Sequence, residues 1–225
     1  VMTESQWDQL VRVVQGEAVR PLPVGFIIDS PWLPGWAGIS LSDYFASNAI
    51  WMEANLKAVR HFPGVIFLPG FWVEYGMCTE PSAFGSKGVW RGNELPFTDK
   101  IIETPRQMAS LKKPDVKSDG LLPLVVKRLE HAREVIEAEG HAIRFAVARG
   151  PLNIATFLMG ATEFLVAMKD SPRETRVMLD TITCFLCDWI KLQKEKIPTI
   201  DGVFLLDDIV GFVGEDDFGE FALPY

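Results

Sequence analysis

The sequence predicts an α/β protein in which parallel strands alternate with helices. Short apolar runs, each suited to a buried strand, alternate with longer segments whose apolar residues recur every three or four positions. Glycine or proline stands at many of the junctions between them. Alternation of this kind is typical of a parallel sheet with helices packed outside it. No repeat or flexible linker divides the chain, so we expect a single domain over residues 1–225.

Four apolar runs are the expected main strands. They span residues 24–28, 65–68, 142–148 and 203–206, and a shorter strand is expected at 88–90. The last run is followed by two carboxylates, a glycine-containing loop and an acidic segment at 215–217. Acidic residues favour the positive end of a helix, so this stretch predicts strand, acidic turn, loop and helix in succession.

Helices are expected between these strands. They span residues 3–15, 42–61, 121–139, 151–168 with a break at Gly160, 171–196, and a last one from 215. Ser171 and Glu174 form a capping box with Pro172 in the first turn. Residues 31–36 combine proline, glycine and tryptophan, and this composition predicts an irregular loop.

Composition limits the classes of function. The net charge of −8 argues against nucleic acid or an anionic membrane as the main partner. Apolar residues make up 48% of the chain, which suits a globular protein, yet no run reaches the roughly 18 apolar residues of a membrane span. The amphipathic start carries Glu4 and Asp8 and is unlike a signal peptide. We therefore expect a cytoplasmic protein.

The three cysteines are too few for a disulfide scaffold. Cys184 and Cys187 lie mid-helix between apolar neighbours, and we expect both to be buried and inert. Cys78 lies in the long segment that carries Glu74, where a passive thiol is favoured over a reactive one. The three histidines show no metal-ligand spacing, so we assign them no role.

Polar side chains follow each main strand. They are Asp29 and Ser30 after the first, Glu74 and Tyr75 beyond the second, Arg149 after the third, and Asp207 and Asp208 after the fourth. Right-handed crossovers place the carboxyl ends of parallel strands at one edge of the sheet, where ligands bind in such folds. We expect a small-molecule site there, although polar residues also follow strands by chance.

Several of these residues have two interpretations. Neighbours on a strand point in opposite directions, so we expect one of Asp207 and Asp208 to face the site while the other caps or pairs. Arg149 either binds an anionic substrate group or pairs with Asp207. Trp32 and Trp36 either form a wall of the site or pack against a helix.

Several sequence stretches, in their order and spacing, carry a resemblance to a known family. They are Asp201-Gly-Val-Phe-Leu-Leu-Asp-Asp-Ile-Val-Gly211, Glu220-Phe-Ala-Leu-Pro-Tyr225, Arg149-Gly-Pro-Leu-Asn-Ile-Ala155, Tyr75-Gly-Met77 and Glu80-Pro-Ser-Ala-Phe-Gly85. From about residue 23 to 225 the chain resembles the uroporphyrinogen decarboxylase (URO-D) superfamily, and most closely its branch that moves methyl groups from corrinoid proteins to thiols. This resemblance implies a (β/α)8 TIM barrel with its site at the C-terminal mouth. Of that barrel the chain would form the N-terminal two-thirds, with the C-terminal strands missing.

Two departures bear on the activity. Uroporphyrinogen decarboxylases carry arginines after the first strand, where this chain has residues 29–35 without arginine, and a Phe-Ser-Asp-Ile motif where this chain has residues 67–70. A substrate with eight carboxylates needs cationic partners, so decarboxylation of a porphyrinogen is the less favoured interpretation.

The resemblance implies a concrete chemistry. Zinc would activate a thiol for attack on a methyl group held by a corrinoid partner protein, with the zinc ligands expected downstream of Tyr225 and none in this chain. The implied catalytic residues are Asp207, Asp208 and Glu74, and the implied substrate-binding residues are Asp29, Trp32, Tyr75 and Arg149. A completing polypeptide or a second copy is expected to cover the open barrel. The alternatives are a decarboxylase and a non-catalytic barrel that binds a corrinoid protein or a small molecule.

Overall fold

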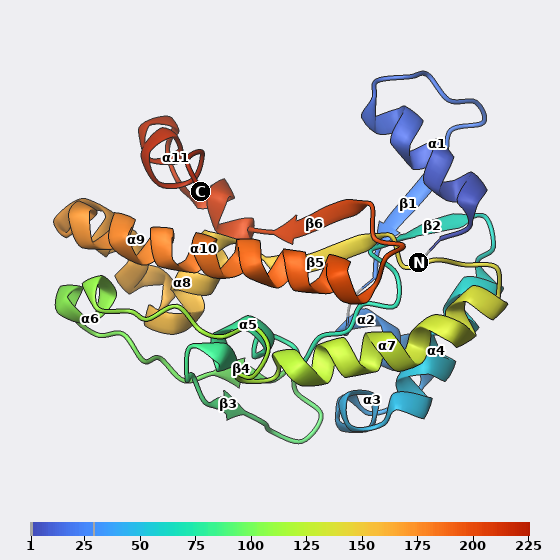
Figure 1. Ribbon diagram of the computed structural model, residues 1–225, viewed down its shortest axis with the longest axis horizontal. Coiled ribbons are helices and arrows are strands. Elements are labelled where there is room, and N and C mark those ends of the chain that lie inside the picture. Colours follow the sequence, from blue (N-terminus) through green and yellow to red (C-terminus); the bar gives the residue numbers. More distant parts are fainter. Residues whose placement is uncertain (1, 29) are drawn as a thin grey trace.

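The computed structural model describes residues 2–28 and 30–225 as helices packed around short strands (Figure 1). The helices are α1 (Glu4–Val14), α2 (Trp32–Ala37), α3 (Leu41–Ala46), α4 (Asn48–His61), α5 (Thr79–Ala83), α6 (Pro105–Ala109), α7 (Leu122–Ala138), α8 (Pro151–Met159), α9 (Ala161–Asp170), α10 (Pro172–Lys196), the short 3-10 helix η1 (Asp208–Phe212) and α11 (Glu215–Phe221). The strands are β1 (Val24–Ile27), β2 (Val65–Leu68), β3 (Gly88–Val89), β4 (Phe97–Thr98), β5 (Phe145–Arg149) and β6 (Gly202–Leu206).

The four main strands form two parallel pairs. β1 pairs with β2 from Val24 opposite Val65, and β5 pairs with β6 from Phe145 opposite Gly202. β3 and β4 form a small antiparallel hairpin. The α/β class is therefore confirmed. In the described part of the chain each pair is a separate two-stranded sheet, so these residues do not form a complete barrel.

Several regions differ from the sequence prediction, which did not include α5, α6 or β4. Residues 32–37 form helix α2 rather than a loop, because Pro34 lies in the first turn, where a missing N–H costs no helical hydrogen bond. The helix expected from Ser42 or Asp43 to His61 is divided at Ser47, whose extended backbone ends α3. The Ser47 hydroxyl accepts a hydrogen bond from the N–H of Ile50 and so caps α4.

The third main strand begins later than the apolar pattern predicts. Ala142 forms an isolated antiparallel bridge with Met2, and β5 starts only at Phe145. The carbonyl of Arg144 accepts hydrogen bonds from the N–H groups of both Asp201 and Gly202, so regular pairing with β6 begins only at Phe145. The break expected at Gly160 is confirmed: its φ of +105° is favourable only for glycine, and α8 and α9 meet there.

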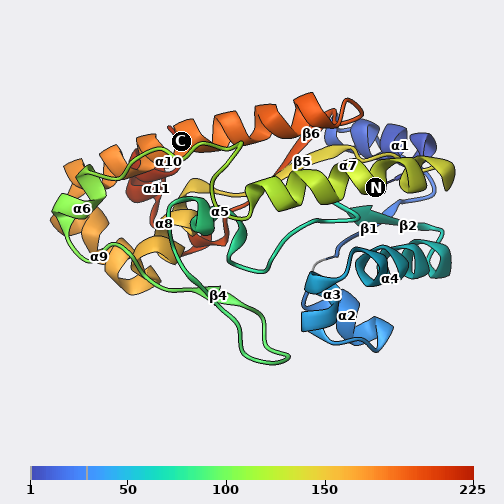
Figure 2. The same cartoon turned by 60° about the horizontal axis from the view of Figure 1, so that its bottom comes forward.

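Helix α10 is the centre of the core. Its buried face carries Met178, Leu179, Ile182, Phe185, Leu186 and Trp189 at helical spacing. This face contacts β5, α8 and α9, and α7 runs beside the same strand (Figure 2). At the edge of β5, the side-chain amide of Gln193 bonds both the N–H and the C=O of Val147, each at 3.0 Å. A side chain therefore satisfies strand groups that a neighbouring strand would otherwise bond.

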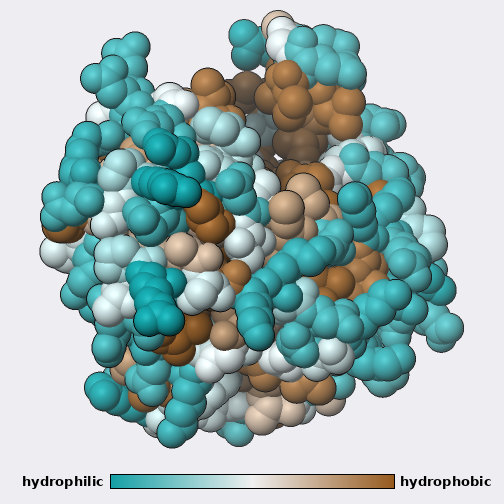
Figure 3. All heavy atoms as spheres, turned by 60° about the vertical axis from the view of Figure 1, so that its left-hand side comes forward, coloured by the Kyte–Doolittle hydropathy of each residue, from teal (hydrophilic) through white to brown (hydrophobic). Residues whose placement is uncertain are grey.

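Two outer strands expose apolar side chains. Phe26 and Ile27 on β1 and Val203 and Leu205 on β6 are each about half exposed, at 59%, 57%, 51% and 49%. In the view of Figure 3, apolar side chains gather around a hollow in the upper part of the face. Exposed apolar surface on a strand that lacks a neighbour is typical of a face that other protein covers.

Within the described residues, no single helix is long and apolar enough to cross a membrane. Among the described helices, α8 and α9 reach the required length and apolar composition when they are taken together. The two helices are bent by 106° where they join.

Candidate functional site

A buried ion pair joins two segments that follow different strands. Arg149 ends β5, and Glu74 lies in the loop after β2. One guanidinium nitrogen of Arg149 lies 2.7 Å from a carboxylate oxygen of Glu74, with side-chain exposures of 14% and 4%. The guanidinium also lies over the ring of Trp72, 5.0 Å from its centre. Arg149 thus pairs with Glu74, and not with Asp207 as one interpretation of the sequence proposed.

Ser30 connects this pair to the end of β1. Its backbone N–H and its hydroxyl both donate to the second carboxylate oxygen of Glu74, at 3.2 and 2.7 Å. Ser30 is itself buried. The segments after β1 and β2 and the end of β5 therefore meet at one carboxylate, as parallel topology predicts.

Glu80 is a second buried carboxyl group at the same place. It lies in the first turn of α5, and one of its oxygens accepts a hydrogen bond from the backbone N–H of Arg149 at 3.1 Å. Burial raises the pKa of Glu80, and the nearby charge of Arg149 opposes this only in part. The prediction of site residues missed Glu80. The available signal was an acidic side chain in a stretch that already carried the family resemblance.

Asp207 has a different position and different partners. Its two carboxylate oxygens accept hydrogen bonds from the backbone N–H groups of Leu152 and Asn153 at 3.0 and 2.8 Å. The Asp207 carboxylate thus caps the N-terminus of α8. The backbone of Gly150 packs so closely against this carboxylate that a side chain there would collide with it. Burial raises the pKa of Asp207 to about 6, against the opposite effect of the two N–H donors. Asp208 begins η1 and is exposed.

The remaining predicted site residues lie apart from the ion pair or outside the described residues. Tyr75 is buried, with the guanidinium of Arg128 over its ring at 5.2 Å. Trp32 is 43% exposed and stacks on Trp36, with ring centres 5.4 Å apart. It lines an apolar groove of about 440 Å³ along β1. Asp29 lies outside the described residues.

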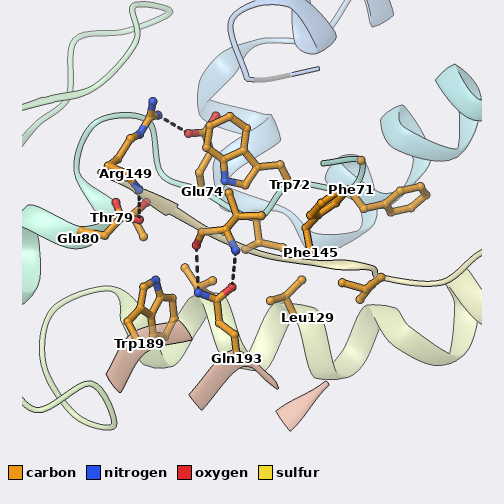
Figure 4. A pocket seen from close by; sticks show the side chains of 15 residues that line it. Phe71, Trp72, Glu74, Thr79, Glu80, Leu129, Phe145, Arg149, Trp189 and Gln193 are labelled. Atoms are coloured by element: carbon orange, nitrogen blue, oxygen red, sulfur yellow. Dashed lines mark hydrogen bonds and ion pairs between the residues drawn. The ribbon is translucent and has the colours of Figure 1, made fainter. Parts of the chain in front are cut away.

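A small cavity lies beside the ion pair (Figure 4). Its volume is about 20 Å³, and its lining includes Glu74, Glu80, Arg149, Trp189 and Gln193. That space suits one water molecule and no larger ligand. A substrate would therefore have to bind outside the cavity, at the open end of the strands.

The described residues do not fit a zinc ion. They contain no group of three or more His, Cys, Asp or Glu side chains placed to hold a metal. Cys78 is buried, its thiol donates to the carbonyl of Phe97 at 3.3 Å, and burial raises its pKa to about 11. Cys184 and Cys187 are exposed on the outer face of α10, so the expectation that they are buried was wrong. The apolar neighbours face inward, and the cysteines occupy the opposite side of the helix.

Parallel strands joined through helices, with buried ionisable groups where the strands end, define a protein of the α/β class, in which ligands typically bind at the carboxyl ends of the strands. The family model for uroporphyrinogen decarboxylase (URO-D) matches residues 5–225, and the chain belongs to that family.

The fold is also similar to a solved structure, a methyltransferase from Methanosarcina mazei. The TM-score is 0.76 at 16% sequence identity, and the match covers 99% of this chain and 64% of the other. The chain therefore spans just under two-thirds of the length of that methyltransferase. Among curated proteins no match was found.

Proposed function

We propose that this chain is part of a methyltransferase that moves a methyl group between a corrinoid protein and a thiol. The family is uroporphyrinogen decarboxylase, and a structural neighbour is a methyltransferase, which supports the methyltransferase branch over the decarboxylases. The observation that carries the proposal is the charge balance at the ends of the strands. Among the described polar residues that follow the main strands, Arg149 is the only cation, and Glu74 already pairs with it.

That charge balance suits a substrate with few negative charges. A porphyrinogen with eight carboxylates needs several cationic partners, and each unpaired carboxylate would lose its hydration without compensation. A thiol and a methyl group need no such set. Asp207, Glu74 and Arg149 would serve to shape and orient the mouth. Trp32 and Tyr75 would contribute aromatic surface beside it, and Asp208 is available at the exposed rim.

Zinc enters the proposal only through residues outside this chain. When bound, zinc would supply a thiolate at neutral pH by lowering the pKa of the substrate thiol. The described residues do not fit the ion, so the ligands are proposed to lie downstream of Tyr225 or on a completing polypeptide or second copy. The same additional protein would cover the exposed apolar strands. A compartment that keeps thiols reduced, the cytoplasm, is proposed for the same chemistry.

Methyl transfer from methylcobalamin to a small thiol tests the proposal. The full-length protein that contains this chain is incubated with both, and the loss of the cobalt–methyl absorbance is followed. We expect zinc-dependent loss of that absorbance, which removal of zinc by a chelator abolishes. A protein that instead releases carbon dioxide from a porphyrinogen would overturn the proposal in favour of the decarboxylase.

The non-catalytic alternative rests on the lack of a metal cluster in the described residues. It predicts binding of a corrinoid protein with no turnover, even when zinc is supplied. Calorimetric binding measured beside the methyl-transfer assay separates these two functions.

A further inference from the structure

The cavity behind the ion pair contains a polar group with no partner. The indole nitrogen of Trp189 is buried and has no hydrogen-bond acceptor among the described residues, and the side chain is only 1% exposed. Figure 4 shows the indole of Trp189 on the side of Glu80 and Thr79, with its nitrogen turned toward them. An indole N–H is a donor only and is normally satisfied when buried. This donor therefore points to a ligand that is an acceptor.

The size of the cavity identifies the class of ligand. A volume of about 20 Å³ holds one water molecule, which needs two to four polar partners. Glu80 lines the same cavity and is 5% exposed. A water molecule there can accept hydrogen bonds both from the indole N–H of Trp189 and from the O–H of a protonated Glu80, whose other oxygen accepts from the N–H of Arg149. This arrangement satisfies both buried donors.

The charges around Glu80 determine its protonation. Two carboxyl groups, Glu74 and Glu80, face one cation. The guanidinium of Arg149 bonds to Glu74, whereas Glu80 accepts hydrogen bonds from backbone N–H groups, its own and that of Arg149. Helices α7 and α10 present Val125, Leu129, Trp189 and Gln193 to the cavity, none of which is charged. A second negative charge in so apolar a place is costly, and burial accordingly raises the pKa of Glu80.

We infer that Glu80 is a neutral, proton-carrying acid, and that it and the indole N–H of Trp189 bind one water molecule in this cavity. The site then holds one buried proton directly behind Arg149. Arg149 keeps Glu74 as its single ionised partner at the cavity. This inference concerns the resting protein and does not depend on the proposed methyl transfer.

Infrared spectroscopy at neutral pH tests the proton. A protonated carboxyl group has a C=O stretching band that a carboxylate lacks, and Asp207, with a pKa of about 6, is then largely ionised. We expect the band in the wild type, its loss in Glu80→Gln, and its retention in Glu163→Gln, the matched control at an exposed carboxylate paired with Lys100. A spectrum without this band, or a band unchanged in Glu80→Gln, would overturn the inference.

Two further measurements keep the test independent of whether every variant folds. The stability of the wild type should fall as pH rises above the ordinary pKa of a glutamate, because the folded state holds the proton more tightly, and Glu80→Gln should reduce that slope. A high-resolution crystal structure should show one water between Trp189 and Glu80, and Trp189→Phe should lose it. An empty cavity in the wild-type crystal would contradict the water, and an unchanged slope would contradict the proton.

Discussion

The guanidinium group of Arg149 lies 2.7 Å from the carboxylate of Glu74, although 75 positions of sequence separate the two residues. This contact holds the end of β5 against the loop after β2, although no strand of one parallel pair is paired with a strand of the other among the described residues. Ser30 adds the segment after β1 to the same carboxylate. A single buried carboxylate therefore organises three of the four main strand ends.

Removing Glu74 should destabilise the protein strongly. Glu74→Ala leaves the largely buried guanidinium of Arg149 without its charged partner, and loss of one member of a buried pair costs about 3–5 kcal/mol. Urea unfolding, followed by circular dichroism, measures the change. The matched control is Glu163→Ala, which breaks an exposed pair with Lys100 and should cost at most about 1 kcal/mol. Equal losses in the two variants would show that the buried pair has no special role.

Asp207 should stabilise helix α8, and Asp208 should not. Asp207→Ala removes both acceptors at the helix N-terminus, and loss of such a cap costs about 0.5–2 kcal/mol. Asp208→Ala changes an exposed residue and should stay within about 0.5 kcal/mol. Denaturant unfolding of both variants checks the difference. If Asp208→Ala proved the more destabilising, the assignment of the capping residue would be wrong.

Asp207 should also give the stability a pH dependence between about 4 and about 6. Its pKa is raised from 3.8 to about 6 in the folded protein, so the folded state binds the proton more tightly than the unfolded state. The protonated carboxyl group of Asp207 therefore stabilises the folded protein below pH 4, and this contribution is lost as pH rises through 6. We expect the melting temperature to fall less steeply with pH across this range in Asp207→Asn than in the wild type. The Asp208→Asn variant measures the common contribution of other carboxylates, which is subtracted.

The exposed apolar residues of β6 should promote association. Val203→Thr and Leu205→Thr together remove apolar surface from a strand edge while keeping side chains that favour strands. We expect less self-association, measured by light scattering, and an unfolding free energy within about 0.5 kcal/mol of the wild type for this chain. Ala146→Thr and Ala148→Thr on β5 are the contrast, because these positions are buried and should destabilise. Unaltered association in the β6 variant would mean that another face drives it.

The sequence predicts most elements because their signals are local. The period of α10, the proline that opens it and the glycine that separates α8 from α9 each act within one turn of the chain, and all three predictions are confirmed. The boundaries that failed depend on contacts from elsewhere. β5 starts at Phe145 because its bounds depend on where β6 begins to pair with it. Cys184 and Cys187 are exposed because the opposite side of α10 packs on the core.

The site shows the same division. Which polar residues follow which strand can be read directly from the sequence, and three of those strand ends do meet. Which side chains pair there could not be read from it: the sequence suggested Asp207 or a substrate anion for Arg149, and the pairing with Glu74 depends on distances across the fold. Glu80 was missed because it lies in a long segment for which the sequence predicts no helix, and its burial depends on how α5 packs.

By itself, the sequence determined the α/β class, the four main strands with the longer helices between them, and the family, because hydrophobic periodicity, turn residues and motif spacing are properties of the chain. Only the tertiary structure decided that Glu74 receives Arg149, that Asp207 caps α8, and that Glu80 lies buried behind the ion pair. The physical reason is that burial and charge pairing depend on which distant groups exclude water from one another, and that is established only when the chain has packed.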